Sequence, residues 1–343
     1  MKIAVMGAGA IGSLVAGYLK LKGEEVYLVG HSEAVRAVRE NGLRISGCRG
    51  DSKAVIDIYE LLISRPELLI LATKTQDIAR ALQDNLAFLK DTLILTTQNG
   101  VQAERIVAGL VPENKILSSI VMFGATCLEP GKVTHNFEGD WVLGNVFADA
   151  ADARLVPVSM SLNKAFPIVI SENISGMKYL KIFVNANNCI PAILGVSMQE
   201  AFSDPRISAL SIAIWKEGLE IVAKAGIKLV SLPGFPVENI TRLTGLPAEE
   251  AARAFSGVMA KLSRDPLYGS ILQSIKRGRP SEIDYINGEF VSLGERSRSK
   301  ADLNRKLVEM VHAVEKTQRF FTKPELIKAT EGLLGLSTAV GGV

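Results

Sequence analysis

The sequence of 343 residues predicts a parallel α/β domain followed by an all-α domain. In the first 110 residues or so, short apolar runs alternate with helical segments, which is typical of a doubly wound sheet covered by helices on both faces. From about residue 173, apolar residues recur with the 3.6-residue period of helices, and strand-like runs become rare. We place the domains at residues 1–170 and 171–325, followed by a C-terminal tail at 326–343.

The elements of the α/β domain are expected in strict alternation. Short apolar runs predict strands at residues 2–6, 25–29, 67–72 and 92–97. Helices are expected up to about residue 21, from a cap at Ser32 to Gly42, and over 77–89 and 102–110. Two further strand-like runs, 116–123 and 132–143, could finish the sheet as antiparallel edge strands.

The helical domain is expected to contain at least five long helices. Apolar periodicity places them at residues 175–194, 205–225, 247–262, 282–293 and 301–322. The sequence assigns no role to the extension after about residue 320. It leaves the oligomeric state open, although exposed apolar helix faces often mark dimers, so a homodimer is one alternative.

Composition argues against several function classes. Hydrophobic residues make up 48% and charged residues 22%, and the net charge of +3 is interspersed, which does not favour nucleic-acid binding. Small residues interrupt the apolar N-terminal stretch, so neither a membrane span nor a signal peptide is expected. Three cysteines without paired spacing indicate a reducing, cytoplasmic setting. The histidines are too scattered to predict a metal site: His31, His135 and His312.

A glycine pattern lies between the first predicted strand and the helix that follows. Gly7 permits a tight turn, Gly9 lets the backbone approach a pyrophosphate, and Gly12 allows close packing of helix on strand. The helix N-terminus adds free N–H groups and a positive dipole end. In this context the pattern predicts a Rossmann-type dinucleotide site, with a purely structural turn as the alternative. Its residues are Gly7, Ala8, Gly9, Ala10, Ile11 and Gly12.

The end of the second predicted strand bears on the choice of dinucleotide. An NAD enzyme usually carries a carboxylate there, but this chain has none before Glu33. The sequence therefore favours NADP (NADPH), whose 2′-phosphate His31, Ser32 and Arg36 could contact. The alternative is that His31 is only an exposed loop residue.

Four polar side chains follow predicted strands or lie on helices where a ligand could bind. Lys74 and Asn99 follow the third and fourth strands, at the sheet edge where α/β proteins bind ligands. Lys181 and Asn185 are four residues apart and so share one face of an apolar helix. The alternatives are a solvated loop lysine, a turn asparagine and a snorkelling lysine.

The helical half contains two further candidates. Glu282 opens the string Glu-Ile-Asp-Tyr-Ile-Asn-Gly, and Ser270 opens Ser-Ile-Leu-Gln-Ser. Either could be only a helix cap.

The order of these motifs resembles the ketopantoate reductase family over residues 1 to about 310. The resemblance is carried by Gly-x-Gly-x-x-Gly, Lys-Thr-Gln, Gln-Asn-Gly, Lys-x-x-x-Asn, Ser-x-Leu-Gln-Ser and, most distinctively, Glu-Ile-Asp-Tyr-Ile-Asn-Gly. It implies NADPH-dependent reduction of 2-dehydropantoate (ketopantoate) to pantoate, a step of pantothenate biosynthesis.

The resemblance also implies a role for each candidate residue. Lys181 would protonate the keto oxygen as hydride arrives, and Glu282 would stabilise and position that lysine. Asn185 and Ser270 would hold oxygens of the 2-oxoacid substrate. Asn99 and Lys74 would contact the cofactor side of the site, and Asn99 is also a candidate for substrate binding.

The sequence departs from the family pattern at three positions. His31 stands where arginine is common, while Cys189 and Leu267 stand where asparagine is expected. These changes put 2′-phosphate recognition and the exact substrate in doubt. Two alternatives therefore stay open: a reductase of another 2-oxoacid, and a non-catalytic protein that senses NADP.

Overall fold

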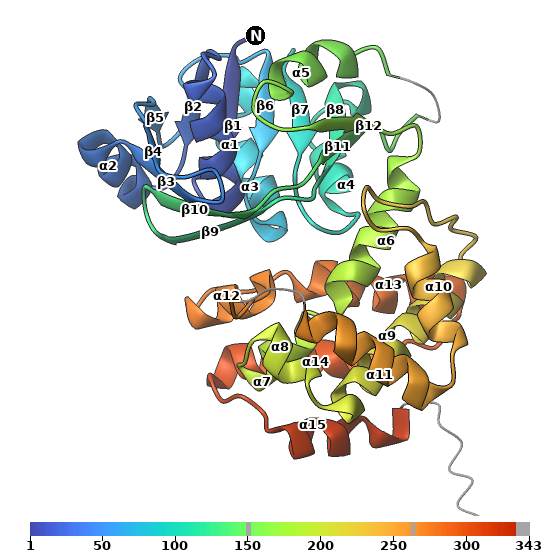
Figure 1. Cartoon of the computed structure of the whole chain (residues 1–343). Coiled ribbons are helices and arrows are strands. Elements are labelled where there is room, and N and C mark those ends of the chain that lie inside the picture. Colours follow the sequence, from blue (N-terminus) through green and yellow to red (C-terminus); the bar gives the residue numbers. More distant parts are fainter. Residues whose placement is uncertain (149–151, 262–264, 334–343) are drawn as a thin grey trace, which may run out of the picture. The chain divides into compact units, whose positions relative to one another are not determined.

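The computed structural model describes residues 1–148, 152–261 and 265–333. The chain divides into two compact units, Met1–Lys178 and Tyr179–Val343 (Figure 1). Helix α6 (Ile174–Ala186) contains the boundary between them. Among the described residues, no helix is both long and apolar enough to cross a membrane.

The first unit is built on a sheet that has eight strands among the described residues, in the order β12-β11-β8-β7-β6-β1-β2-β5. The six strands from β8 to β5 pair in parallel, and β11 runs antiparallel to β8. This arrangement confirms the predicted α/β sheet. The strands are β1 (Ile3–Met6), β2 (Val26–Val29), β5 (Ile58–Tyr59), β6 (Leu68–Leu71), β7 (Leu93–Thr96), β8 (Ile116–Val121), β11 (Trp141–Gly144) and β12 (Ile168–Ile170).

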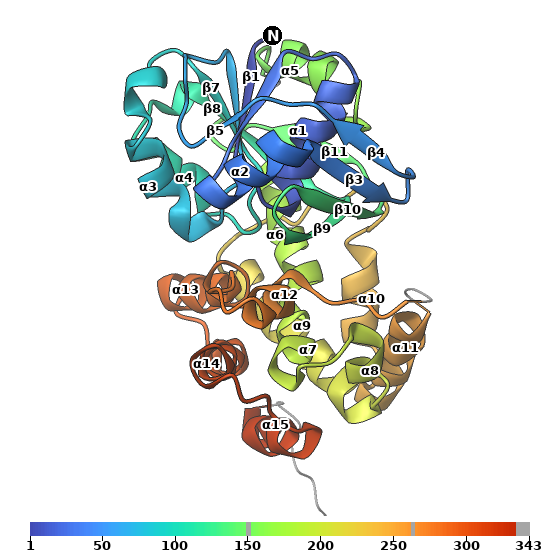
Figure 2. The same cartoon turned by 90° about the vertical axis from the view of Figure 1, so that its left-hand side faces the viewer.

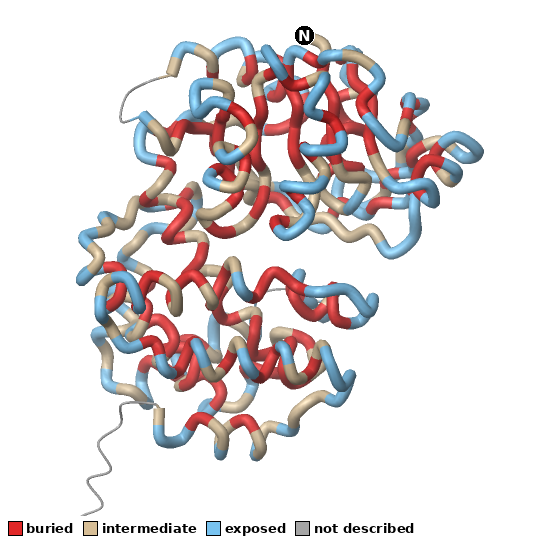
Figure 3. The backbone as a smooth tube through the Cα atoms, turned by 180° about the vertical axis from the view of Figure 1, so that it is seen from behind, coloured by how far each residue is buried: buried red, intermediate tan, exposed pale blue. Residues whose placement is uncertain are grey.

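Both faces of this sheet are covered. Along β1, Ile3 and Val5 pack in the cluster that contains α1 (Ala10–Leu21), whereas Ala4 and Met6 pack in the cluster that contains α3 (Ile78–Gln83) and α4 (Ala103–Ala108). This alternation follows from the two-residue period of a strand. Figure 2 shows α3 and α4 on one side of the sheet and α1 on the other, and Figure 3 shows the buried strands between them.

A second sheet, absent from the prediction, lies in the same unit. Its order is β4-β3-β10-β9, with β3 (Leu43–Gly47), β4 (Ser52–Ala54), β9 (Gly124–Glu129) and β10 (Lys132–Phe137). The expectation that 116–123 and 132–143 finish the main sheet as antiparallel edge strands was right only for the end of the second run, where β11 pairs antiparallel with β8. Residues 116–121 continue the parallel pairing, and 132–137 pair with β3 because Val133 and His135 face inward on α1.

The remaining helices of this unit are short. Helix α2 begins at Ser32 with His31 as its N-cap, one residue before the predicted cap. The helix predicted over 77–89 is split into a 3₁₀ turn, α3 and a second 3₁₀ turn. The elements are α2 (Ser32–Asn41), α5 (Leu155–Leu162), η1 (Thr75–Asp77), η2 (Leu86–Phe88) and η3 (Glu113–Lys115).

The second unit confirms the predicted all-α domain. Its described residues contain helices, 3₁₀ turns and one isolated bridge, Leu232 to Phe235. They are α7 (Cys189–Leu194), α8 (Met198–Phe202), α9 (Pro205–Lys224), α10 (Glu238–Gly245), α11 (Ala248–Ala260), α12 (Ser270–Lys276), η4 (Ile283–Tyr285), α13 (Asn287–Ser297), α14 (Asp302–Thr317), α15 (Lys323–Thr330) and η5 (Glu331–Leu333).

Helix α9 is the central element of this unit, packing against α10, α11, α13 and α14. Asp204 caps it through the N–H of Arg206, and Pro205 occupies its first turn. Phe183 and Phe290 meet edge to face, 4.8 Å apart between ring centroids, beside Gly218. A Cβ at Gly218 would lie 2.8 Å from the Phe183 ring, so the glycine permits this packing.

Several helices differ from the prediction in where they begin, break or end. The helix expected over 175–194 is interrupted at residues 187–188, and the helix expected from 282 begins at Asn287 after the η4 turn. Where a tail was expected from 326, α15 continues to Thr330 with Leu326 fully buried. The rest of the predicted tail, residues 334–343, lies outside the described residues.

Candidate active site

The glycine turn after β1 has two glycines that the fold requires and one that it does not. Gly7 has a φ of +115°, and a Cβ there would lie 2.6 Å from the Ala72 carbonyl carbon. A Cβ at Gly12 would lie 1.9 Å from the Gly7 carbonyl oxygen. At Gly9, by contrast, a Cβ would meet no heavy atom within 4 Å. The backbone at Gly9 therefore borders open space.

That space adjoins the N-terminus of α1. Gly9 is the N-cap, makes no side-chain cap hydrogen bond, and is followed by a first turn without acidic residues. The free N–H groups and the helix dipole favour an anion there. Strand β1 lies between β2 and β6, where the strand order reverses, and open α/β sheets bind ligands at such a point. The turn fits the pyrophosphate of a dinucleotide.

The end of β2 lies against the same turn. A Cβ at Gly30 would come within 2.5 Å of the Ala8 Cβ, so the two segments are in close contact. His31 and Arg36 are both exposed, and Glu33 lies in the first turn of α2. The structure thus places His31 next to the glycine turn, with its side chain toward solvent.

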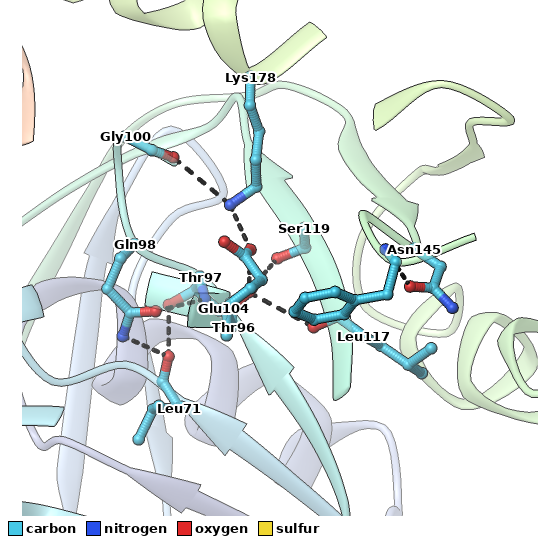
Figure 4. A network of polar contacts seen from close by, with 11 residues as sticks. Leu71, Thr96, Thr97, Gln98, Gly100, Glu104, Leu117, Ser119, Asn145 and Lys178 are labelled. Atoms are coloured by element: carbon cyan, nitrogen blue, oxygen red, sulfur yellow. Dashed lines mark hydrogen bonds and ion pairs between the residues drawn. The ribbon is translucent and has the colours of Figure 1, made fainter. Parts of the chain in front are cut away.

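Lys74 and Asn99 follow neighbouring strands, β6 and β7, and both are half-buried. The side-chain amide of Gln98 donates to the Leu71 carbonyl oxygen at 2.9 Å (Figure 4). It also donates to the Thr73 carbonyl oxygen at 2.9 Å. These bonds join the ends of the two strands. The two predicted residues therefore lie on segments that meet at the edge of the sheet where the glycine turn lies.

A buried ion pair supports the Asn99–Gly100 turn, and sequence reasoning missed it. Lys178 of α6 pairs with Glu104 of α4, with side-chain exposures of 2% and 1% (Figure 4). The Lys178 ammonium also approaches the Gly100 carbonyl oxygen at 3.5 Å, and the Thr96 hydroxyl donates to Glu104 at 2.6 Å. The sequence signal that could have revealed this pair is a carboxylate, Glu104, among the apolar residues of the buried face of α4.

The charge state of Glu104 follows from these contacts. Burial by itself would raise the pKa of the carboxyl group. The charge and hydrogen bond of Lys178, with the Thr96 hydroxyl, outweigh burial and lower that pKa below its ordinary value. Glu104 is therefore ionised at neutral pH.

In the helical unit, Lys181 and Asn185 lie one turn apart on α6 and are both half-buried. Burial lowers the pKa of the Lys181 ammonium to about 8. An amine with a pKa near the working pH can be protonated at rest and still release its proton readily.

Glu282 and Ser270 lie on other elements of this unit. Ser270 is exposed at the start of α12, whereas Glu282 is buried just before η4. His312 of α14 contacts Asp284 of η4 and Glu315 of its own helix, at 2.9 Å each, and the first of these contacts joins α14 to η4. Burial opposes the charge on His312, but these two carboxylates outweigh it and raise its pKa.

Comparisons with known proteins match both units to one family. Residues 3–147 match the family described as Ketopantoate reductase PanE/ApbA, and residues 173–315 match its C-terminal domain. A 2-dehydropantoate 2-reductase of Pyrococcus horikoshii is 32% identical over 321 residues, which cover 92% of this chain and 98% of that protein. The chain belongs to the ketopantoate reductase family. This confirms the resemblance seen in the sequence.

Solved structures extend the comparison. A D-mandelate dehydrogenase in complex with NADH and anilino(oxo)acetate has a TM-score of 0.80 and 28% identity, covering 92% of this chain and 99% of that one. A PanE/ApbA family ketopantoate reductase from Ralstonia eutropha JMP134 has a TM-score of 0.78 at 24% identity, covering 93% and 99%, and shares the fold. Proteins named ketopantoate reductase and D-mandelate dehydrogenase therefore share this fold.

Cys189 and Leu267, two residues at which this chain departs from the ketopantoate reductase pattern, both make hydrogen bonds within the helical unit. Cys189 is fully buried, burial raises the pKa of its thiol to about 12, and Asn287 donates to its sulfur at 3.7 Å. Leu267 is half-buried, and its backbone N–H donates to the Gln199 side chain at 3.0 Å. The Cys189 thiol is therefore part of a buried polar cluster.

Proposed function

We propose that this chain is a 2-oxoacid reductase that uses a nicotinamide dinucleotide. The observation that carries the proposal is the Lys181 amine, which lies half-buried on α6 with a pKa lowered to about 8. A general acid with such a pKa can protonate a ketone oxygen near neutral pH. Membership of the ketopantoate reductase family supports this reading.

In the proposed reaction the helical unit contributes the proton. Reduction of a ketone develops negative charge on its oxygen, and the Lys181 ammonium stabilises that charge and then donates a proton to the oxygen. Asn185, one turn away, and Ser270 offer hydrogen bonds to the other substrate oxygens. Glu282 holds the lysine in position. When bound, the reduced nicotinamide supplies the hydride.

The α/β unit contributes the dinucleotide site. Gly9 leaves room for the pyrophosphate, and the α1 N-terminus supplies N–H donors. Lys74 and Asn99 follow β6 and β7. We assign both to contact with the cofactor, and Asn99 also to substrate binding. In the proposed role both side chains orient the nicotinamide end of the dinucleotide.

The first candidate substrate is 2-dehydropantoate, with NADPH as the reductant and pantoate as the product, which would serve pantothenate biosynthesis. The name of the Pyrococcus horikoshii relative supports this choice. The lack of a carboxylate before Glu33 at the end of β2 supports NADPH, because a carboxylate would repel the 2′-phosphate.

A second candidate is an aryl-substituted 2-oxoacid reduced with NADH. The observation that favours it is the similarity to a D-mandelate dehydrogenase that binds NADH. Cys189 and Leu267 point the same way, because they replace polar side chains expected in the family with less polar ones. His31 replaces the arginine that would bind a 2′-phosphate.

The test follows the absorbance of reduced nicotinamide with NADPH or NADH and with each of the two substrates. We expect rapid turnover with at least one pair, lost in Lys181→Ala and kept in Lys216→Ala, which removes an exposed lysine of the same unit. Turnover with NADH and the aryl substrate only would select the second candidate. Tight dinucleotide binding without turnover on any 2-oxoacid would contradict the proposal and favour an NADP sensor.

A further inference from the structure

Three side chains that bind metals in other proteins converge on the second sheet of the α/β unit. Cys48 follows β3, His135 lies in β10, and Glu138 follows β10. One ligand atom of each lies within 4.8 Å of the other two. Separation along the chain hid this cluster from sequence analysis, which treated the histidines as scattered.

The backbone holds this cluster together. His135 pairs with Gly47 in the β3–β10 register, and the Cys48 N–H donates to the His135 carbonyl oxygen at 2.9 Å. Gly47 has a φ of +115°, and a Cβ there would lie 2.1 Å from that oxygen. The glycine therefore allows the close approach that places Cys48 beside His135.

The imidazole of His135 points independently to a ligand-binding role. Its side chain is 0% exposed, and its Nδ1 shares a hydrogen bond with the Tyr18 hydroxyl at 3.1 Å. Its Nε2 has no hydrogen-bond partner among the described residues and lies 4.0 Å from a Glu138 oxygen. Buried polar atoms without partners are uncommon.

We propose that Cys48, His135 and Glu138 form a binding site for a divalent cation of the zinc class. Thiolate, imidazole and carboxylate are the ligands that zinc prefers, and three of them leave a fourth position for water. The hydrogen bond between Nδ1 and the Tyr18 hydroxyl fixes the ring, and in the proposed site Nδ1 donates this bond and Nε2 is the ligand atom. Binding forms the metal–sulfur bond and releases the Cys48 thiol proton to solvent.

Closing this site requires two exposed side chains to move. Zinc–ligand bonds of about 2.0–2.3 Å place ligand atoms roughly 3.3–3.7 Å apart, so the Cys48 sulfur and Glu138 carboxylate must draw in by about 1 Å. Glu138 is half exposed, but Arg49 holds both of its oxygens, at 2.5 and 2.7 Å. Arg49 competes with the cation for this carboxylate and weakens its binding.

Arg49 does not depend on Glu138 for its own position. Its guanidinium donates to the Ala165 carbonyl oxygen at 2.7 Å and lies over the Tyr18 ring, 4.7 Å from the centroid. The Glu138 carboxylate can therefore turn toward a cation while the arginine stays in place. Once a cation has displaced the Cys48 thiol proton, Arg49 remains as one cationic side chain beside two anionic ligands.

In the experiment, a chelator first strips the full chain of metal, and the protein is then titrated with Co²⁺. Zn²⁺ is added next to displace the Co²⁺, and calorimetry measures the binding of Zn²⁺. We expect one equivalent of Co²⁺ to give a thiolate-to-cobalt absorption band. Cys48→Ser should abolish the band and weaken Zn²⁺ binding more than about tenfold. Cys127→Ser, which alters another cysteine of the same sheet, should keep both.

A second variant guards against an effect on folding. Glu138→Gln changes an exposed side chain and should weaken Zn²⁺ binding about 10–100-fold while the band persists. A wild-type protein that shows no thiolate band, or a Cys48→Ser variant that binds Zn²⁺ as tightly as the wild type, would overturn the proposal. Neither readout depends on reductase activity.

Discussion

Replacing Lys178 with methionine removes one member of the buried ion pair in the α/β unit. The two partners, Lys178 and Glu104, are 2% and 1% exposed, so water cannot replace the lost ammonium. The variant would leave an ionised carboxylate supported mainly by the Thr96 hydroxyl, which donates at 2.6 Å. Breaking a buried pair in this way costs about 3–5 kcal/mol of unfolding free energy.

The same estimate fixes the expected melting temperature. For a unit of this size, each kcal/mol lowers Tm by about 2–4 °C, so Lys178→Met should lose roughly 6–20 °C. The double variant Lys178→Met with Glu104→Gln should recover most of the loss. Its two neutral side chains leave no unpaired charge, and the glutamine can still accept from Thr96.

The cost should also depend on pH. The lowered pKa of Glu104 means that its ionised form stabilises the folded state above the unfolded pKa of about 4.5, and this stability is lost as pH falls through the folded value. In Lys178→Met the carboxyl group takes up a proton more readily, because the ammonium no longer opposes burial. The difference between variant and wild type should therefore narrow as pH falls.

Urea unfolding, followed by circular dichroism, measures these differences. Arg80→Met is the control, because Arg80 and Asp84 form an exposed pair in the same unit, 3.9 Å apart, whose loss should cost below about 0.5 kcal/mol. A Lys178→Met variant within about 1 kcal/mol of wild type, or a double variant no more stable than the single one, would refute the reasoning.

Other predictions concern the glycine turn, a histidine and a buried thiol. Gly9→Ala should keep the Tm of the wild type but bind dinucleotide weakly in a fluorescence titration. Gly12→Ala should also lower the Tm, because of the two added Cβ atoms only the one at Gly12 meets backbone atoms. Gly257→Ala, which also places its Cβ in open space, serves as the control. The raised pKa of His312 predicts that this side chain stabilises the protein fully below about pH 6.5, and that the effect is lost as pH rises through the pKa of the folded state. Urea unfolding of the wild type and His312→Gln measures the effect. A difference in stability that does not change with pH would contradict the prediction. Cys189 should resist alkylation in the native protein, as seen by mass spectrometry, and its rapid labelling would argue against burial of the thiol.

Local patterns allowed much of the fold to be predicted. The strands β1, β2, β6 and β7 were located to within about a residue at each end, because buried parallel strands are short continuous apolar runs. The switch to helical periodicity likewise revealed the second domain. The family resemblance was confirmed by matches in both units. The roles assigned to individual site residues remain predictions.

The buried ion pair and the cluster on the second sheet depend on contacts between distant parts of the chain. Glu104 and Lys178 are 74 residues apart, and Cys48 and His135 are brought together by the pairing of β3 with β10. No periodicity within a segment reveals such pairings. The helix break at 187–188 was missed for another reason, since apolar residues continue at helical spacing on both sides of it.

The most direct test of the proposed chemistry measures single-turnover oxidation of the reduced dinucleotide by a 2-oxoacid, in wild type and in Lys181→Ala, as a function of pH. Dinucleotide affinity is measured on the same samples. The reduction rate of the wild type should fall as pH rises through about 8, where Lys181 loses its proton. Lys181→Ala should bind dinucleotide normally and react about 100-fold or more slowly. A variant that reacts at close to the wild-type rate, with the same pH profile, would contradict the assignment of Lys181 as the proton donor.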